Sequence, residues 1–348
     1  MNMRKSFYQF LFMAAFMLLP LTASAVEIGG INYVFNVSNK TAEVTNKAYQ
    51  GSVVIPDDVT YNWVKFRVTG IAGKAFEGCT GLTSVTIGNN VTYIGNRAFY
   101  GCSGLTSVTI GNNVTTIGGN AFQDCRSLVS IDIPDNVTTI KMGAFCRCTS
   151  LTSIVIPNSM RYIEQSVFAS CSSLASVVIG NSVKDIGSDA FQYCEALTSI
   201  TIPNNVRSIG DGAFHDCSNL TSVVIGNGIE YIESMVFANC KALTEVFCYA
   251  KEMPLMVNGL KFVTDAFQGS PIEQASLYVP VSKIEQYKSL EPWKNFGNII
   301  PVDDAVGVVS AHKDCSDTTI KYDLQGRRLT KKPTKGLYIQ DGKKVVVR

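Results

Sequence analysis

Cysteine is the residue type in this chain that could do the most chemistry, because a thiol can form a disulfide, bind zinc or act as a nucleophile. The chain has 11 cysteines but only two histidines. Eight of the cysteines recur at a fixed step of 23 residues: Cys79, Cys102, Cys125, Cys148, Cys171, Cys194, Cys217 and Cys240. A fixed period of this length is typical of stacked repeats. The chemistry therefore depends on how neighbouring repeats place these thiols.

Stacking geometry favours free thiols over disulfides in this column. Equivalent residues of stacked strands lie about 4.8 Å apart, which suits the Cα separation of a disulfide. Stacked side chains point the same way, however, whereas a disulfide needs its two Cβ atoms about 3.8 Å apart. Free cysteine also behaves as a small buried apolar residue. We therefore predict buried free thiols, with disulfides as the alternative. Zinc is disfavoured because Cys146 and Cys148 are the only close pair.

A Cys/His dyad is the other chemistry to consider, since His215 lies two residues before Cys217. The column of His215 is mixed, and a mixed column faces solvent: Glu77, Tyr100, Gln123, Cys146, Ala169, Gln192, His215 and Ala238. We therefore predict a surface histidine. The sequence contains no paired acidic motif, phosphate-binding loop or serine nucleophile elbow. It predicts a protein that is not an enzyme and has no cofactor or metal site.

The elements that carry these cysteines keep the same 23-residue step. Within one unit, Leu82, Val85 and Ile87 predict a short strand with one buried face. Glycine or proline at the position of Gly88 ends the strand, and a second extended piece covers residues 91–94. A short helical or 3-10 turn then carries Ala98, Phe99 and Cys102. One unit cannot bury its apolar face alone, so stacked units must share a continuous core.

This unit resembles the BspA-type leucine-rich repeat, a 23-residue class found on bacterial surface proteins. The resemblance covers about residues 50–250. It implies an α/β-type repeat solenoid, right-handed, with a parallel β-sheet on one face and short helical or 3-10 turns opposite. It also implies a binding or adhesive role and no catalysis.

The segments outside the repeats suggest the domain organisation. Residues 1–25 combine Arg4 and Lys5 with a ten-residue apolar run and Ala23-Ser24-Ala25, which predicts a cleaved signal peptide. The further segments are predicted as an N-terminal hairpin cap (26–58), the leucine-rich-repeat solenoid (59–250), an irregular last repeat with a strand-helix C-cap (251–301), a linker (302–320) and a basic β-hairpin tail (321–348). Two motifs in the tail, at 322–327 and 336–339, resemble sorting or anchoring segments of Gram-negative secreted proteins.

Composition limits the class of partner. A net charge of +2 over 348 residues gives no sign of a nucleic-acid partner. After residue 25, no segment approaches the roughly 20 apolar residues that span a bilayer. We expect an exported protein, at the cell surface, in the outer envelope or secreted, that binds a protein or glycan such as a host-matrix or neighbouring-cell protein. The alternative is a structural envelope protein without a dedicated ligand.

The outer face of the strands offers a candidate binding site, because residues between the buried ones project outward. The column that begins with Thr86 becomes apolar along the chain: Thr109, Asp132, Val155, Val178, Thr201, Val224 and Phe247. On the next segment Arg161, Lys184 and Arg207 stack in adjacent units, where like charges repel. We hypothesise that this column forms a partner-binding patch bordered by the three basic residues. The alternative is that valine and threonine simply suit strands and the charges are solvated.

Overall fold

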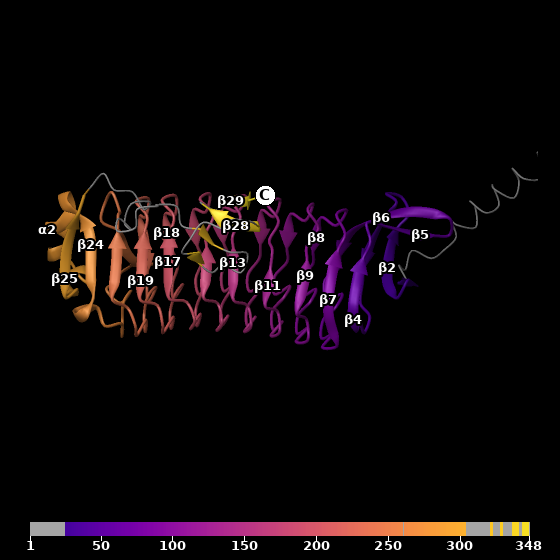
Figure 1. The fold of residues 1–348 in the computed structure, drawn as a ribbon, viewed down its shortest axis with the longest axis horizontal. Helices are drawn as coiled ribbons and strands as arrows, with labels where there is room; N and C mark the ends of the chain where they lie inside the picture. Colours follow the sequence, from indigo (N-terminus) through magenta and orange to yellow (C-terminus); the bar gives the residue numbers. More distant parts are fainter. Residues whose placement is uncertain are drawn as a thin grey trace, which may run out of the picture.

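The computed structural model describes residues 25–259 and 261–303, and the backbone of four short strands between residues 321 and 347. Residues 1–24 and 304–320 lie outside this description, and with them the predicted signal peptide and nearly all of the predicted linker. The described repeats form an elongated stack, with β5 (Asp58–Tyr61) and β6 (Val64–Ile71) near one end and α2 (Ile284–Ser289) at the other (Figure 1). No helix in the described part is long and apolar enough to cross a membrane.

A first ladder of parallel strands runs along the stack, one strand per repeat. It comprises sheets of four, two and five strands, and β11 lies beside β13 and β15 beside β17 where the pairing is interrupted. Neighbouring repeats pair position for position, so that Val85 lies opposite Val108. Its strands are β4 (Gly51–Ile55), β7 (Leu82–Ile87), β9 (Ser107–Thr109), β11 (Ser130–Ile131), β13 (Ser153–Val155), β15 (Ser176–Val178), β17 (Ser199–Ile202), β19 (Ser222–Ile225), β21 (Glu245–Cys248), β24 (Ser276–Pro280) and β25 (Asn298–Val302).

A second ladder collects the short extended pieces that follow each turn. It is also parallel between repeats, with Ile94 opposite Ile117, and confirms the second extended segment expected from the sequence. Its strands are β8 (Tyr93–Ile94), β10 (Thr116–Ile117), β12 (Thr139–Ile140), β14 (Tyr162–Ile163), β16 (Asp185–Ile186), β18 (Ser208–Ile209), β20 (Tyr231–Glu233), β22 (Leu255–Asn258) and β23 (Lys261–Phe262), the last of which turns back antiparallel.

The phenylalanine-bearing segments form turns rather than helices. The amide of Ala98 donates to the Gly95 carbonyl oxygen at 3.2 Å, and that of Cys102 donates to Phe99 at 3.1 Å. These are 3-10-type bonds, as predicted. Arg97, inside the first of the two turns, has a left-handed φ of +56°, which prevents a continuous helix. The amide of Phe99 instead donates across the stack to Ala121 at 2.7 Å. Bonding between repeats thus replaces bonding within a helix.

A stack of phenylalanine rings forms the centre of the core. From Phe76 to Phe267 the neighbouring ring centroids lie 4.7–5.5 Å apart and the planes differ by at most 16°. Each fully buried Phe side chain contributes about 1.5–3 kcal/mol. Tyr49 contacts the ring of Phe76 at one end of the stack. At the other end, Trp293 and Phe296 meet Phe267 edge-on.

The segments before and after the repeats supply the aromatic residues that cover the two ends of the phenylalanine stack. Before the repeats, β1 (Val26–Ile28), β2 (Ile31–Asn36) and β3 (Thr41–Val44) pair antiparallel, and β3 then pairs parallel with β6 (Val64–Ile71). After the repeats come η1 (Ile272–Gln274), η2 (Val281–Lys283), α2 (Ile284–Ser289) and η3 (Trp293–Asn295). Near the C-terminus an antiparallel sheet contains β26 (Lys321–Tyr322), β27 (Arg328–Leu329), β28 (Gly336–Gln340) and β29 (Lys343–Val347).

Candidate binding faces

The cysteine column is buried and its thiols are engaged. Every cysteine in residues 25–303 is free. From Cys102 to Cys240, each thiol donates to the carbonyl oxygen of a phenylalanine 26 residues earlier, at 3.0–3.4 Å. Burial raises the pKa of Cys102 and of Cys240 to about 12. A thiol that stays protonated and inaccessible is a poor nucleophile, so this column serves packing.

His215 is less exposed than its mixed column predicted. Its side chain is 19% exposed, because the ring of Tyr193 from the preceding repeat packs edge-on against it at 6.1 Å. Its Nδ1 lies 2.7 Å from Asp216 Oδ2, but not in hydrogen-bonding geometry. Among the residues described, no group of three or more His, Cys, Asp or Glu side chains could hold a metal ion.

The outer face of the first ladder, which we call the first-strand face, carries the predicted column. Asp132 and Thr201 are exposed, whereas Val155, Val178 and Phe247 are half-buried. Val224 is buried, with 4% exposure. The prediction of an exposed Val224 was therefore wrong. It lies in register between Thr201 and Phe247, so side chains flank it on both sides.

The structure adds two residues that the sequence had not placed in this column. Phe247 lies opposite Tyr278, and Tyr278 lies opposite Ile300. The rings of Phe247 and Tyr278 stack, with centroids 4.2 Å apart and planes within 8°. The insertion after Cys248 breaks the 23-residue step, which hid this register. The alternation of Leu277 and Val279, both buried like Val246 and Cys248, was the signal that could have revealed it.

The basic residues form a column, but they belong to a different ladder. The amide of Lys184 donates to the Arg161 carbonyl oxygen at 2.7 Å, and that of Arg207 donates to Lys184 at 2.6 Å. They directly precede β14, β16 and β18, which form a sheet separate from β13–β15 and from β17–β25. The predicted single patch is therefore divided between two sheets.

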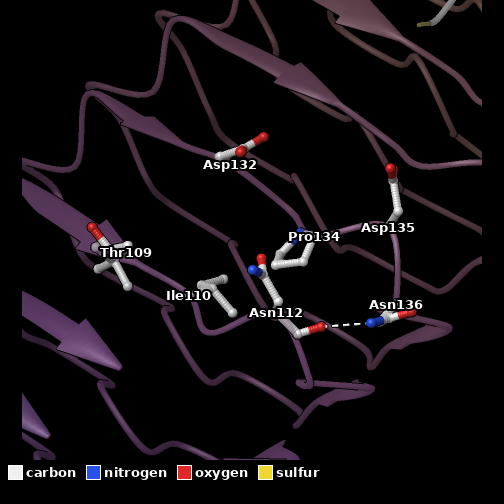
Figure 2. A pocket seen from close by; sticks show the side chains of 8 residues that line it. Thr109, Ile110, Asn112, Asp132, Pro134, Asp135 and Asn136 are labelled. Atoms are coloured by element: carbon white, nitrogen blue, oxygen red, sulfur yellow. Dashed lines mark hydrogen bonds between the residues drawn. The ribbon is translucent and has the colours of Figure 1, made fainter. Parts of the chain in front are cut away.

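A shallow hollow of about 360 Å³ opens near the N-terminal half of the first-strand face. Figure 2 shows two of its lining residues joined by a hydrogen bond, in which Asn136 donates from Nδ2 to the Asn112 carbonyl oxygen at 2.7 Å. Asp132 lines this hollow, so it lies apart from the apolar residues of its column. The other lining residues come from neighbouring strand ends and turns: Val108, Thr109, Ile110, Asn112, Pro134, Asp135 and Asn136.

Comparisons with known proteins give the family. A profile of the BspA type leucine rich repeat region matches residues 69–197 and 166–288, whereas no curated protein sequence matches. A leucine rich cell surface protein from Faecalibacterium prausnitzii is 25% identical, with a TM-score of 0.55, covering 82% of this chain and 99% of that one.

Two further solved structures are similar over shorter or more divergent alignments. The Treponema (T. pallidum) leucine rich repeat protein is 29% identical, with a TM-score of 0.47, covering 63% of this chain and 91% of that one. A leucine-rich-repeat protein from Bacteroides ovatus is 23% identical, with a TM-score of 0.46, over 81% and 93%. The profile match spans well over half of the residues and the repeat columns are all occupied, so this chain belongs to the BspA-type leucine-rich-repeat family.

Proposed function

We propose that this protein is an exported binding module that uses the C-terminal half of its first-strand face to hold a partner protein at the cell surface. Family membership supports a repeat-based interaction module. The similar protein from Faecalibacterium prausnitzii is a cell surface protein. The observation that carries the proposal is the stacked pair of Phe247 and Tyr278 on the outer face of the first ladder.

Fold stability does not require aromatic residues at those two positions. Their column carries threonine at Thr86, Thr109 and Thr201, each of which is exposed on a strand of the same type. Aromatic side chains are enriched at protein interfaces and supply much of the binding energy there. Ile300, half-buried and opposite Tyr278, extends the apolar surface on one side, and Val224, buried and opposite Phe247, adjoins it on the other. A contiguous apolar patch on an outer face often marks an interaction site.

A binding screen tests this function. Residues 26–348 would be measured against a panel of matrix proteins, glycans and cells. The variant Phe247→Thr/Tyr278→Thr, which copies a residue native to the column, should weaken saturable protein binding by about tenfold or more. Thr86→Val/Thr109→Val on the N-terminal half serves as the matched control and should bind normally.

Two outcomes would contradict the proposal. Unchanged affinity of the folded Phe247→Thr/Tyr278→Thr variant would place the partner site elsewhere. Saturable binding to no member of the panel would favour a structural role in the envelope. Circular dichroism and thermal melting of each variant would show that the stack is intact.

A further inference from the structure

One column of the stack changes character halfway along the protein. It occupies the corner just before the second ladder, and we call it the corner column: Thr69, Thr92, Thr115, Thr138, Arg161, Lys184, Arg207 and Glu230. In its first half, Thr92, Thr115 and Thr138 each donate from Oγ1 to the carbonyl oxygen of the threonine one repeat earlier, at 3.0, 3.1 and 3.4 Å. These hydrogen bonds tie successive repeats together.

The basic half of the corner column lacks this stabilisation. The backbone bonding is unchanged at Lys184 and Arg207, whose amides donate to the preceding repeat as those of Thr92 and Thr115 do. Three cations at a spacing of about 4.8 Å repel one another. Within residues 25–303, the ion pairs include neither Arg161 nor Lys184, and Arg207 reaches Glu230 only at 4.0 Å. Threonine would therefore stabilise this column better than lysine or arginine, yet three successive repeats carry a basic residue there.

Two exposed tyrosines directly follow corner-column residues in the sequence, Tyr162 after Arg161 and Tyr231 after Glu230. Tyr162 and Tyr231 are 57% and 42% exposed, and strand register places Asp185 and Ser208 between them. Ser208 donates from Oγ to Asp185 Oδ1 at 2.6 Å. Three repeats separate the two rings, a distance of about 14 Å at the strand spacing. Tyr162, Asp185, Ser208 and Tyr231 thus form a line along the stack, with an aromatic ring at each end and a carboxylate and a hydroxyl between them.

Two glycines, Gly187 and Gly210, follow the second-ladder strands β16 and β18 and let neighbouring repeats approach closely. A Cβ at Gly187 would come within 2.8 Å of the Gln165 amide nitrogen, and one at Gly210 within 2.6 Å of the Ser188 nitrogen. Neither position accommodates a side chain without backbone movement. The acidic side chains at the equivalent positions of the two flanking repeats are engaged elsewhere. Glu164 pairs with Lys141 at 3.2 Å, and Glu233 accepts from the Asp211 amide at 3.0 Å.

We propose that this surface, formed by the basic half of the corner column with Tyr162, Asp185, Ser208 and Tyr231, binds an anionic glycan that lies along the axis of the stack. Lysine and arginine would pair with its sulfate or carboxylate groups. The faces of the tyrosines would pack on the apolar faces of sugar rings. Asp185 and Ser208 would accept hydrogen bonds from sugar hydroxyls. An acidic peptide offers few hydroxyl donors for Asp185, whereas a glycan offers several, so this carboxylate favours the glycan.

The first experiment replaces the three cations by the residue native to the column. Arg161→Thr/Lys184→Thr/Arg207→Thr should weaken binding of heparin by about tenfold or more and flatten its dependence on salt. The melting temperature should stay the same or rise, because threonine restores the inter-repeat bonds. The matched control, Lys65→Thr/Arg126→Thr/Lys241→Thr, removes the same charge from exposed sites elsewhere. Equal loss in both triple variants would overturn the proposal.

The second experiment separates glycan recognition from simple charge attraction. Tyr162→Thr/Tyr231→Thr, which copies Thr116 and Thr139 of the same column, should weaken heparin binding without changing its salt dependence. Poly-L-glutamate should compete poorly. Full affinity of this variant, together with efficient competition by poly-L-glutamate, would show an acidic-polypeptide site and refute the glycan assignment. Phe247→Thr/Tyr278→Thr should bind heparin normally, so this site and the first-strand face can fail independently.

Discussion

At the scale of single residues, the buried thiols determine how the protein responds to alkali. Burial raises the pKa of Cys102 from 9.0 to about 12 and raises that of Cys125 and Cys148 well above 9.0. As pH rises, the unfolded chain therefore loses its thiol protons before the folded chain does. The stability that these thiols contribute is complete below pH 9 and declines between pH 9 and 12.

We expect the melting temperature to fall progressively above pH 9. In Cys125→Ser/Cys148→Ser, a hydroxyl can donate to the same phenylalanine carbonyl oxygens but does not titrate in this range. This variant should start from a lower melting temperature at pH 7 and show a shallower decline above pH 9. Calorimetric scans from pH 7 to 11 measure both. Parallel pH profiles for variant and parent would show that other groups cause the alkaline loss.

Trp63 offers a second test at a single residue. It is 97% exposed and adopts a φ of +66°, in the two-residue turn between β5 (Asp58–Tyr61) and β6. The left-handed conformation costs a non-glycine residue about 1–2 kcal/mol, and glycine is preferred there. Trp63→Gly should raise the free energy of unfolding by about 1 kcal/mol in urea titrations. Trp63→Ala keeps the conformational cost, so an equal gain would contradict this explanation.

At the scale of the element, the phenylalanine stack should dominate stability. Phe168 is 1% exposed and lies between Phe145 and Phe191 at 5.5 and 5.4 Å. Phe168→Ala should lower the free energy of unfolding by about 3–5 kcal/mol, because the rigid neighbours cannot close the cavity. For comparison, Tyr100→Gln copies Gln123 and loses the contact with the Arg97 guanidinium, worth about 0.5–1 kcal/mol. Similar losses for the two would mean that the core column is misassigned.

The elements also show where sequence reasoning works and where it stops. Leu82, Val85 and Ile87 were predicted to be buried because burial imposes a strict pattern, and all three are buried. Exposure on the outer face depends on neighbours from other strands, so Val224 could not be distinguished from Val178. Tyr278 was missed because strand pairing continues across an insertion that removes the period. The sequence also did not show that Arg161 and Val155 belong to different sheets, because the chain turns a corner between them within one repeat.

At the scale of the whole molecule, the repeats should behave as exchangeable units. Deleting residues 103–125 removes one period and joins Cys102 to Arg126 without altering the columns. Because each repeat contacts mainly its neighbours, the shortened protein should fold, keep its circular dichroism per residue and melt cooperatively at a somewhat lower temperature. Deleting residues 103–114 removes half a period and should prevent folding. A folded half-period deletion would show that register between repeats is not required.

The direction of the hydrogen bonds between repeats has a mechanical consequence. The bonds from Thr115 to Thr92 and from Phe99 to Ala121 join successive repeats and therefore run along the axis of the stack. A pulling force applied between the two ends would act on every interface in series, so each interface would carry the whole force, because the strands of the described repeats run across the axis and not along it. The stack would yield by releasing single coils from an end, each adding about 75 Å of extended chain. Under flow, such a protein would work as an extensible tether that absorbs a sudden load by lengthening.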